Sequence, residues 1–149
     1  MSTAPAMTQA LQAIAAKVGG SPMKVLEIDL TDDSMAIQAV DPAKPTEVNE
    51  FTYRDGSVQD PQPVDISGSD PGALEQNLFD DSSIKPAVVA KLIVDAVPAS
   101  KIDGAKVVST IIKRNLPFSA DIQIVVNVSG TRATKQVRAT ADGTVTGIV

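Results

Sequence analysis

Residues 24–26 read Lys-Val-Leu, and residues 106–108 read Lys-Val-Val. An offset of 82 residues maps the first stretch onto the second. The same offset relates three apolar pairs that precede these stretches: Met7 and Val89, Leu11 and Ile93, and Ile14 and Ala96. The chain of 149 residues therefore reads as two copies of one unit, in which a helix is followed by strands.

The stretch before each copy of this motif has helical periodicity. Met7, Leu11, Ile14 and Val18 recur at the spacing of one helix face, which predicts an amphipathic helix over residues 3–18. Ser2 or Thr3 can cap its start, and Gly19-Gly20 can end it. The second helix is predicted to start near Pro86 and to end at Pro98, because proline interrupts helices.

The stretches after each helix alternate between apolar and polar residues, as half-buried strands do. Residues 24–30 and 121–128 show this alternation most clearly. Asp55-Gly56 and Asp142-Gly143, which lie 87 residues apart, are hairpin turn signals. Pro61 and Pro63 reduce the strand expected over residues 57–66 to a loose edge strand, because proline cannot donate to a sheet.

These patterns predict an α+β fold. It consists of two repeats of one helix followed by a four-stranded antiparallel meander, with the helices packed on one sheet face. The first repeat is expected at residues 1–66 and the second at 84–149. Residues 67–83 form a connector, in which Asp70-Pro71 indicates the start of a short helix.

The composition excludes several kinds of chemistry. The chain has no His and no Cys, so it has no histidine general base, no Ser-His-Asp triad, no cysteine nucleophile and no disulfide. Familiar zinc sites need one of these two residue types. No glycine-rich phosphate loop occurs either. We therefore expect a protein that is not an enzyme and has no catalytic residue, no metal site and no cofactor.

Four acidic residues, Glu27, Asp29, Asp32 and Asp33, form the one cluster that could support acid–base chemistry or a divalent cation. The alternative is a solvated strand face followed by an acidic turn. An enzyme that uses only carboxylates and lysine stays open as a further hypothesis, behind the binding functions.

Charge is distributed unevenly along the chain. Residues 1–75 contain 4 basic and 12 acidic side chains, whereas residues 76–149 contain 9 basic and 6 acidic ones. No dense basic stripe is present, so nucleic-acid binding is not expected. No apolar stretch approaches the ~20 residues of a transmembrane helix. The chain as written has no signal peptide and is expected to be cytoplasmic, or periplasmic if Met1 replaces a removed signal peptide.

Exposed aromatic and arginine residues are typical anchors of protein interfaces. Superposing the two Asp-Gly turns places Phe51 opposite Arg138 rather than Val137. Either a bulge differs between the two halves, or Phe51 and Tyr53 face outward. The alternative to an exposed aromatic site is that Phe51 packs under the first helix and Phe118 closes the second core. The candidate partner-binding residues are Phe51, Tyr53, Phe118, Arg132, Lys135 and Arg138.

The strands at residues 106–112 and 122–128 and the Asp142-Gly143 turn resemble the tandem helix-plus-meander architecture of β-lactamase-inhibitor-protein-like and PepSY-like domains. The resemblance spans roughly residues 3–149. It implies a non-enzymatic, bacterial protein, often extracytoplasmic, that binds or inhibits another protein through a concave sheet. Inhibitor-type members usually carry disulfides and an aromatic-rich face, and this chain has neither.

The leading hypothesis is a non-catalytic protein-interaction or inhibitor-like module that binds an unknown protein partner through an exposed antiparallel sheet face. Polar rows from Gln123, Asn127, Lys135 and Arg138 would set its specificity. The alternative function is a small-molecule pocket between the sheet and a helix. Free sheet edges would also allow a homodimer.

Overall fold

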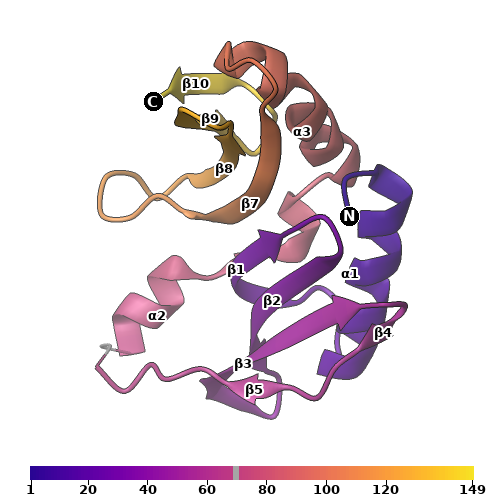
Figure 1. The fold of residues 1–149 in the computed structure, drawn as a ribbon. Helices are drawn as coiled ribbons and strands as arrows, with labels where there is room; N and C mark the ends of the chain where they lie inside the picture. Colours follow the sequence, from indigo (N-terminus) through magenta and orange to yellow (C-terminus); the bar gives the residue numbers. More distant parts are fainter. Residues whose placement is uncertain (69–70) are drawn as a thin grey trace.

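The computed structural model describes residues 1–68 and 71–149. It is an α+β fold, as predicted, with one large antiparallel sheet and a few helices (Figure 1). In chain order the elements are α1 (Ala4–Val18), β1 (Lys24–Leu30), β2 (Ser34–Asp41), β3 (Lys44–Arg54), β4 (Ser57–Val58), β5 (Gln62–Pro63), α2 (Pro71–Asn77), β6 (Phe79–Asp80), a 3-10 turn (Asp81–Ser83), α3 (Pro86–Ser100), β7 (Lys106–Arg114), β8 (Ile122–Ser129), β9 (Thr134–Thr140) and β10 (Val145–Ile148).

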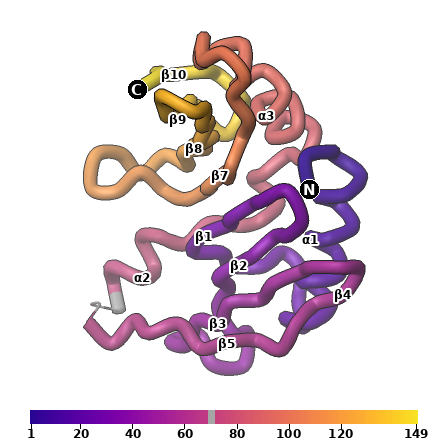
Figure 2. Tube along the Cα trace, viewed as in Figure 1, coloured from indigo at the N-terminus to yellow at the C-terminus, as the bar shows by residue number. Residues whose placement is uncertain are grey.

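A single sheet joins the two halves of the chain. Its strand order is β10-β9-β8-β7-β1-β2-β3-β4, with β5 beside β3 and β6 beside β1. The two halves meet where β1 pairs with β7 in antiparallel fashion, and Asp29 lies opposite Ile111. Helices α1 and α3 lie side by side on one face of this sheet (Figures 1 and 2).

The first helix has the boundaries that its caps favour. The Thr3 hydroxyl accepts a hydrogen bond from the Ala6 N–H at 3.3 Å, and Gly19 ends the helix with a φ of 94°. A side-chain oxygen at the helix start satisfies an otherwise unpaired N–H, and glycine adopts positive φ at little cost.

The second helix does not end at Pro98, as the sequence suggested. It continues to Ser100, and Pro98 lies inside its last turn. Lys101 then adopts a φ of 56°, and its N–H bonds to the Pro98 carbonyl at 3.2 Å. Proline already has a helical φ, so although it removes its own hydrogen bond and crowds the carbonyl four residues earlier, the helix continues past it for two more residues.

The two Asp-Gly turns have different lengths, which resolves the mismatch between the halves. Asp55 and Gly56, with φ angles of 55° and 81°, form a two-residue turn between Tyr53–Arg54 and Ser57–Val58. In the second turn only Gly143 has positive φ, and Thr140 N–H bonds to the Thr144 carbonyl across a three-residue loop. The extra residue in the second loop means that positions at equal distance before the two Asp-Gly pairs point to opposite faces of the sheet.

Phe51 and Tyr53 therefore face the helices and belong to the core. They are 6% and 8% exposed, so they offer almost no surface to a partner, which corrects the candidate interface. The rest of this core is almost entirely aliphatic and forms one cluster that includes residues of α1, α3 and the strands of both halves.

The connector returns the chain from the sheet edge to its centre. The strand expected over residues 57–66 is reduced to β4 and β5, with two residues each. A short helix, α2, follows, while its expected cap Asp70 lies outside the described residues. Phe79 does not belong to that helix: it pairs with Val25 in the short strand β6 and is buried.

Candidate functional site

One sheet face carries α1 and α3, and the other face carries mostly polar side chains. Val40 and Val48 are exceptions, because they share the strand parity of Gln38 and Glu50 and are buried outside the core cluster; the short helix α2 also lies on this side of the sheet (Figure 1). We call the face opposite α1 and α3 the helix-free face. Because side chains alternate along a strand, the residues between the core positions point to it. Its main members are Glu27, Asp29, Gln38, Glu50, Thr52, Ile111, Lys113, Gln123, Val125, Asn127, Gln136 and Arg138.

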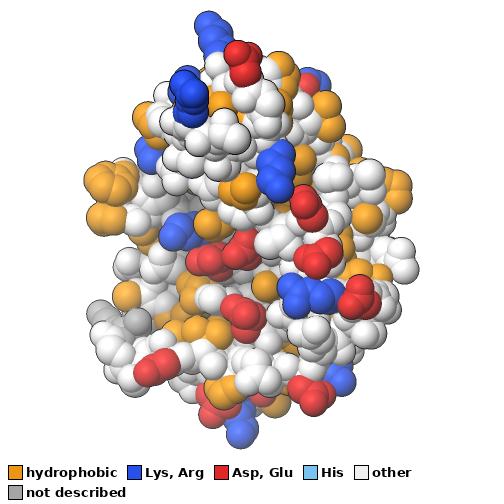
Figure 3. Space-filling model, viewed as in Figure 1, with side chains coloured by type: hydrophobic (Ala, Val, Ile, Leu, Met, Phe, Trp, Pro, Cys, Tyr) orange, Lys and Arg blue, Asp and Glu red, His pale blue; other side chains and the backbone are white. Residues whose placement is uncertain are grey.

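Acidic side chains concentrate on the β1–β3 half of this face. Glu27, Gln38 and Glu50 occupy one row across three adjacent strands, and Gln38 Nε2 donates to Glu50 Oε2 at 3.4 Å. Asp29 lies two residues further along β1. Figure 3 shows carboxylates and basic groups close together near the middle of this view. The fold therefore gathers acids from two strands that are distant in sequence.

The environment makes two of these acids harder to ionise. Burial raises the pKa of Glu27; Lys113 lowers it, and Asp29 and Glu50 raise it further by charge repulsion. Burial also raises the pKa of Asp29, and Glu50 adds to the effect. The Oδ1 atom of Asp29 is buried and has no hydrogen-bond partner in the described part of the chain. A cation placed here would favour the ionised forms of both Glu27 and Asp29.

The acidic cluster suggested by the sequence does not form one group. Glu27 and Asp29 lie half-buried on the helix-free face, whereas Asp32 and Asp33 are exposed in the turn after β1. Asp33 accepts a hydrogen bond from the Thr31 hydroxyl at 3.0 Å and lies 3.8 Å from Arg54. Over residues 1–68 and 71–149, no set of three or more acids could hold a metal ion.

The basic candidates divide between the two faces. Arg138 lies on the helix-free face, where its guanidinium donates to Gln136 Oε1 at 2.9 Å. Lys135 instead points to the helix side and donates to the Ser100 carbonyl at 2.8 Å, at the end of α3. Lys135 therefore does not belong to the polar row on the sheet face in which the sequence pattern placed it with Gln123, Asn127 and Arg138. Arg132 is exposed in the turn before β9.

Phe118 is highly exposed, with 87% of its surface accessible. It does not close the second core. It lies in the loop between β7 and β8, which projects from the sheet in Figure 1. The loop is tied internally, because Asn115 N–H bonds to the Asp121 carbonyl and Phe118 N–H to the Asn115 carbonyl, both at 2.9 Å. The backbone thus holds Phe118 outward.

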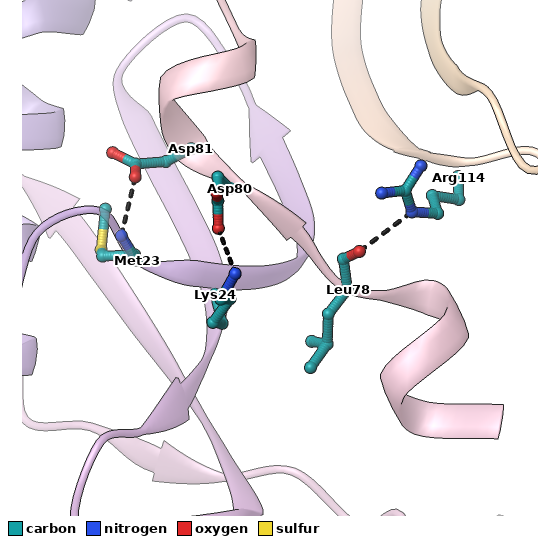
Figure 4. Close-up of polar contacts among 6 residues, drawn as sticks. All are labelled: Met23, Lys24, Leu78, Asp80, Asp81 and Arg114. Carbon is teal, nitrogen blue, oxygen red and sulfur yellow. Dashed lines mark hydrogen bonds and ion pairs between the residues drawn. The ribbon is translucent and has the colours of Figure 1, made fainter. Parts of the chain in front are cut away.

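Arg114 joins this loop to the connector. Its Nη1 donates to the Ala120 carbonyl at 2.6 Å and its Nε to the Leu78 carbonyl at 2.9 Å. Two contacts fix the other side of the connector to β1: Met23 N–H donates to Asp81 at 2.7 Å, and Lys24 pairs with Asp80 at 2.6 Å (Figure 4). The rim beside the helix-free face is therefore anchored at several points.

A hollow of about 420 Å³ lies at the other end of strands β7 to β9. Asn127 and Gln136 line it, together with three apolar residues, Val108, Val128 and Val149. Asn127 Nδ2 donates to Ser109 Oγ at 2.9 Å. The hollow thus offers hydrogen-bonding groups beside aliphatic surface.

Sequence reasoning missed Glu50 and Gln38 as members of the acidic row. The signal was present, because both alternate with core residues: Glu50 precedes Phe51, and Gln38 follows Ile37. What the pattern lacked was the register that places Glu27, Gln38 and Glu50 side by side.

Comparison with protein-family models, with curated proteins and with solved structures finds no match to this chain. In the part of the chain that the structure describes, no helix has the length and apolar character needed to cross a membrane.

Proposed function

We propose that this chain is a non-catalytic protein-binding module that uses its helix-free face, and that two helix-plus-strand units build this face together. The main support is the set of half-buried charged groups on a sheet face that α1 and α3 leave uncovered. Polar groups that are partly desolvated and incompletely paired favour a partner that can pair them.

The proposed partner presents a basic segment to the β1–β3 half. Charge repulsion from Asp29 and Glu50 helps to raise the pKa of Glu27, repulsion from Glu50 helps to raise that of Asp29, and Lys113 is the basic group that lowers the pKa of Glu27. A lysine or arginine from a partner would add the missing positive charge. The internally hydrogen-bonded loop that presents Phe118 lies beside this face and supplies an exposed aromatic anchor.

A random-peptide phage library provides a test that needs no known partner. We expect selection on the wild-type protein to enrich Lys- and Arg-containing peptides. The variant Glu27→Gln/Glu50→Gln should bind the selected peptides about tenfold more weakly, because it removes two charges without changing shape. Asp60→Asn, which removes an exposed charge outside this face, is the matched control.

Three results would contradict this function. One is enrichment of peptides with no excess of basic residues. The second is equal binding of the selected peptides to the wild type and to the Glu27→Gln/Glu50→Gln variant. The third is binding that stays unchanged as salt is raised, which would argue against a charge-based contact.

A second candidate, small-molecule binding, is favoured by the hollow beside Asn127 and Gln136. Its volume of about 420 Å³ is within the range of ligand pockets. Native mass spectrometry of the purified protein tests it. A retained small molecule that Gln136→Leu releases and Glu27→Gln does not would favour this candidate over the peptide-binding face.

A further inference from the structure

Helices α1 and α3 occupy equivalent places in the fold. Each has 15 residues, and their first and last residues are 82 positions apart. Their buried positions follow the same offset: Met7 with Val89, Ala10 with Leu92, and Ile14 with Ala96. Both helices also end at a residue with positive φ, Gly19 and Lys101, which are again 82 apart.

The strands that follow the helices agree pair by pair. On β1 and β2, Val25 lies opposite Ala39 and Glu27 opposite Gln38, with an irregularity between the two pairs. On β7 and β8, the corresponding pairs are Val107 with Val128 and Ser109 with Asn127, with an irregularity at the same step. A bulge at matching positions is a feature of backbone geometry that side-chain pattern alone does not require.

The contact between β1 and β7 has the symmetry of a homodimer interface. Asp29 pairs with Ile111, the residue 82 positions later. On either side of this pair, Ile28 pairs with Ile112 and Leu30 with Thr110. Thr110 is the residue 82 positions after Ile28, and Ile112 is the residue 82 positions after Leu30, so the offset converts each pair into the other. A two-fold axis generates this reciprocity, because residue i then meets j wherever j meets i.

We propose that residues 4–58 and 86–148 are two copies of one helix-plus-strand unit, related by a two-fold axis between Asp29 and Ile111. In this view the chain is a homodimer joined into one polypeptide, and the partner that the edge of β1 fits is a second copy of its own unit. This inference does not depend on the proposed binding function.

The comparison also locates where the copies have diverged. The offset is 82 along β1 and β7 and 89 along β2 and β8, so the connection between the strands is seven residues longer in the second unit. This longer connection is the loop that holds Phe118. On the helix-free face, the counterparts of Glu27, Asp29 and Glu50 are Ser109, Ile111 and Gln136. The second unit therefore lacks the acidic group and has the longer loop.

Grafting one helix into the place of the other tests the equivalence in the full chain. Replacing residues 86–100 with the sequence of residues 4–18 puts Met7, Ile14 and Val18 at buried positions of α3. The matched control uses residues 3–17, which rotates the apolar stripe by about 100° and puts Gln9 and Lys17 there instead. We expect the in-register graft to unfold cooperatively in urea at a clearly higher midpoint than the control.

Equal urea midpoints for two folded grafts, or a higher midpoint for the control, would overturn the proposal. If neither graft folds, the single substitution Thr110→Ile tests the proposal instead, because Ile28 is the residue of the first unit that corresponds to Thr110. Its matched control is the isomer Thr110→Leu. A higher urea midpoint for Ile than for Leu supports equivalence; an equal or lower one overturns it.

Discussion

Asp29 and Ile111 face each other across the central pair of strands β1 and β7, so a carboxylate lies beside an aliphatic side chain in the middle of the sheet. Asp29 is half-buried, and its Oδ1 atom lacks a hydrogen-bond partner among the described residues. The position is costly for a charged group, since burial without pairing favours the neutral form.

The stability of the protein should therefore fall as pH rises from acid to neutral through these groups. Burial raises the pKa of Asp29 above its ordinary 3.8 and the pKa of Glu27 above its ordinary 4.5. A raised pKa in the folded state means tighter proton binding on folding, so the stabilising contribution is present at low pH and lost as pH rises through the folded pKa. We expect Glu27→Gln/Asp29→Asn to raise the urea midpoint at pH 7, and less so near pH 4.

Asp142 provides a control of opposite sign. Hydrogen bonds from Thr140 and Thr144 hold the pKa of Asp142 below its ordinary value. Its contribution to stability is therefore present at neutral pH and lost as pH falls through that pKa. Asp142→Asn should lower the urea midpoint at pH 7. A rise there would contradict the assignment of these signs.

Thr110 should be replaceable by valine with a gain in stability. Its side chain is 1% exposed, and its hydroxyl has no hydrogen-bond partner in the described part of the structure. A buried, unpaired hydroxyl costs about 1–3 kcal/mol, and Thr110→Val removes it with little change in volume. Urea unfolding should show an increase of about 1 kcal/mol. Thr110→Ser, which keeps the hydroxyl, should not stabilise.

Phe51 and Phe118 should respond oppositely to truncation. Phe51 is 6% exposed in the core, so Phe51→Ala should cost about 3–5 kcal/mol in the free energy of unfolding. Phe118 is 87% exposed, so Phe118→Ala should change that free energy by less than about 0.5 kcal/mol. A large loss of stability on truncating Phe118 would mean that its loop serves the fold rather than a partner.

Arg114 should control the order of the loop that holds Phe118. Its guanidinium donates to the Leu78 and Ala120 carbonyls, and hydrogen bonds from charged groups contribute about 1.5–3 kcal/mol. Arg114→Ala should speed amide hydrogen exchange at residues 115–121 and leave exchange in α1 unchanged. Arg114→Lys, which keeps the charge but cannot form both bonds, should give an intermediate rate.

Much of the local structure could be predicted from the residues because it depends on near neighbours. The strand predicted at residues 24–30 has those bounds in the structure, and the helix end at Gly19 follows from the conformational freedom of glycine. The prediction that the second helix ends at Pro98 was wrong, because a proline ends a helix only when the residues after it leave the helical conformation, and here they continue to Ser100. Comparing the two halves could not settle the exposure of Phe51 and Tyr53, because the loop after β9 is one residue longer than the turn after β3 and the two turns therefore cannot be superposed in register.

Periodicity, turn residues and composition are local properties, so the amino-acid sequence was enough to predict the order of the main helices and strands and the kinds of chemistry that the chain lacks. The pairing of β1 with β7, which are not consecutive in the chain, became visible only in the folded structure. Pairing β1 with β7 joined the two halves into one sheet, and the register between strands placed Glu27 beside Gln38 and Glu50. Such contacts depend on backbone hydrogen bonds between distant segments, and the alternation of side chains within a strand does not specify its neighbours.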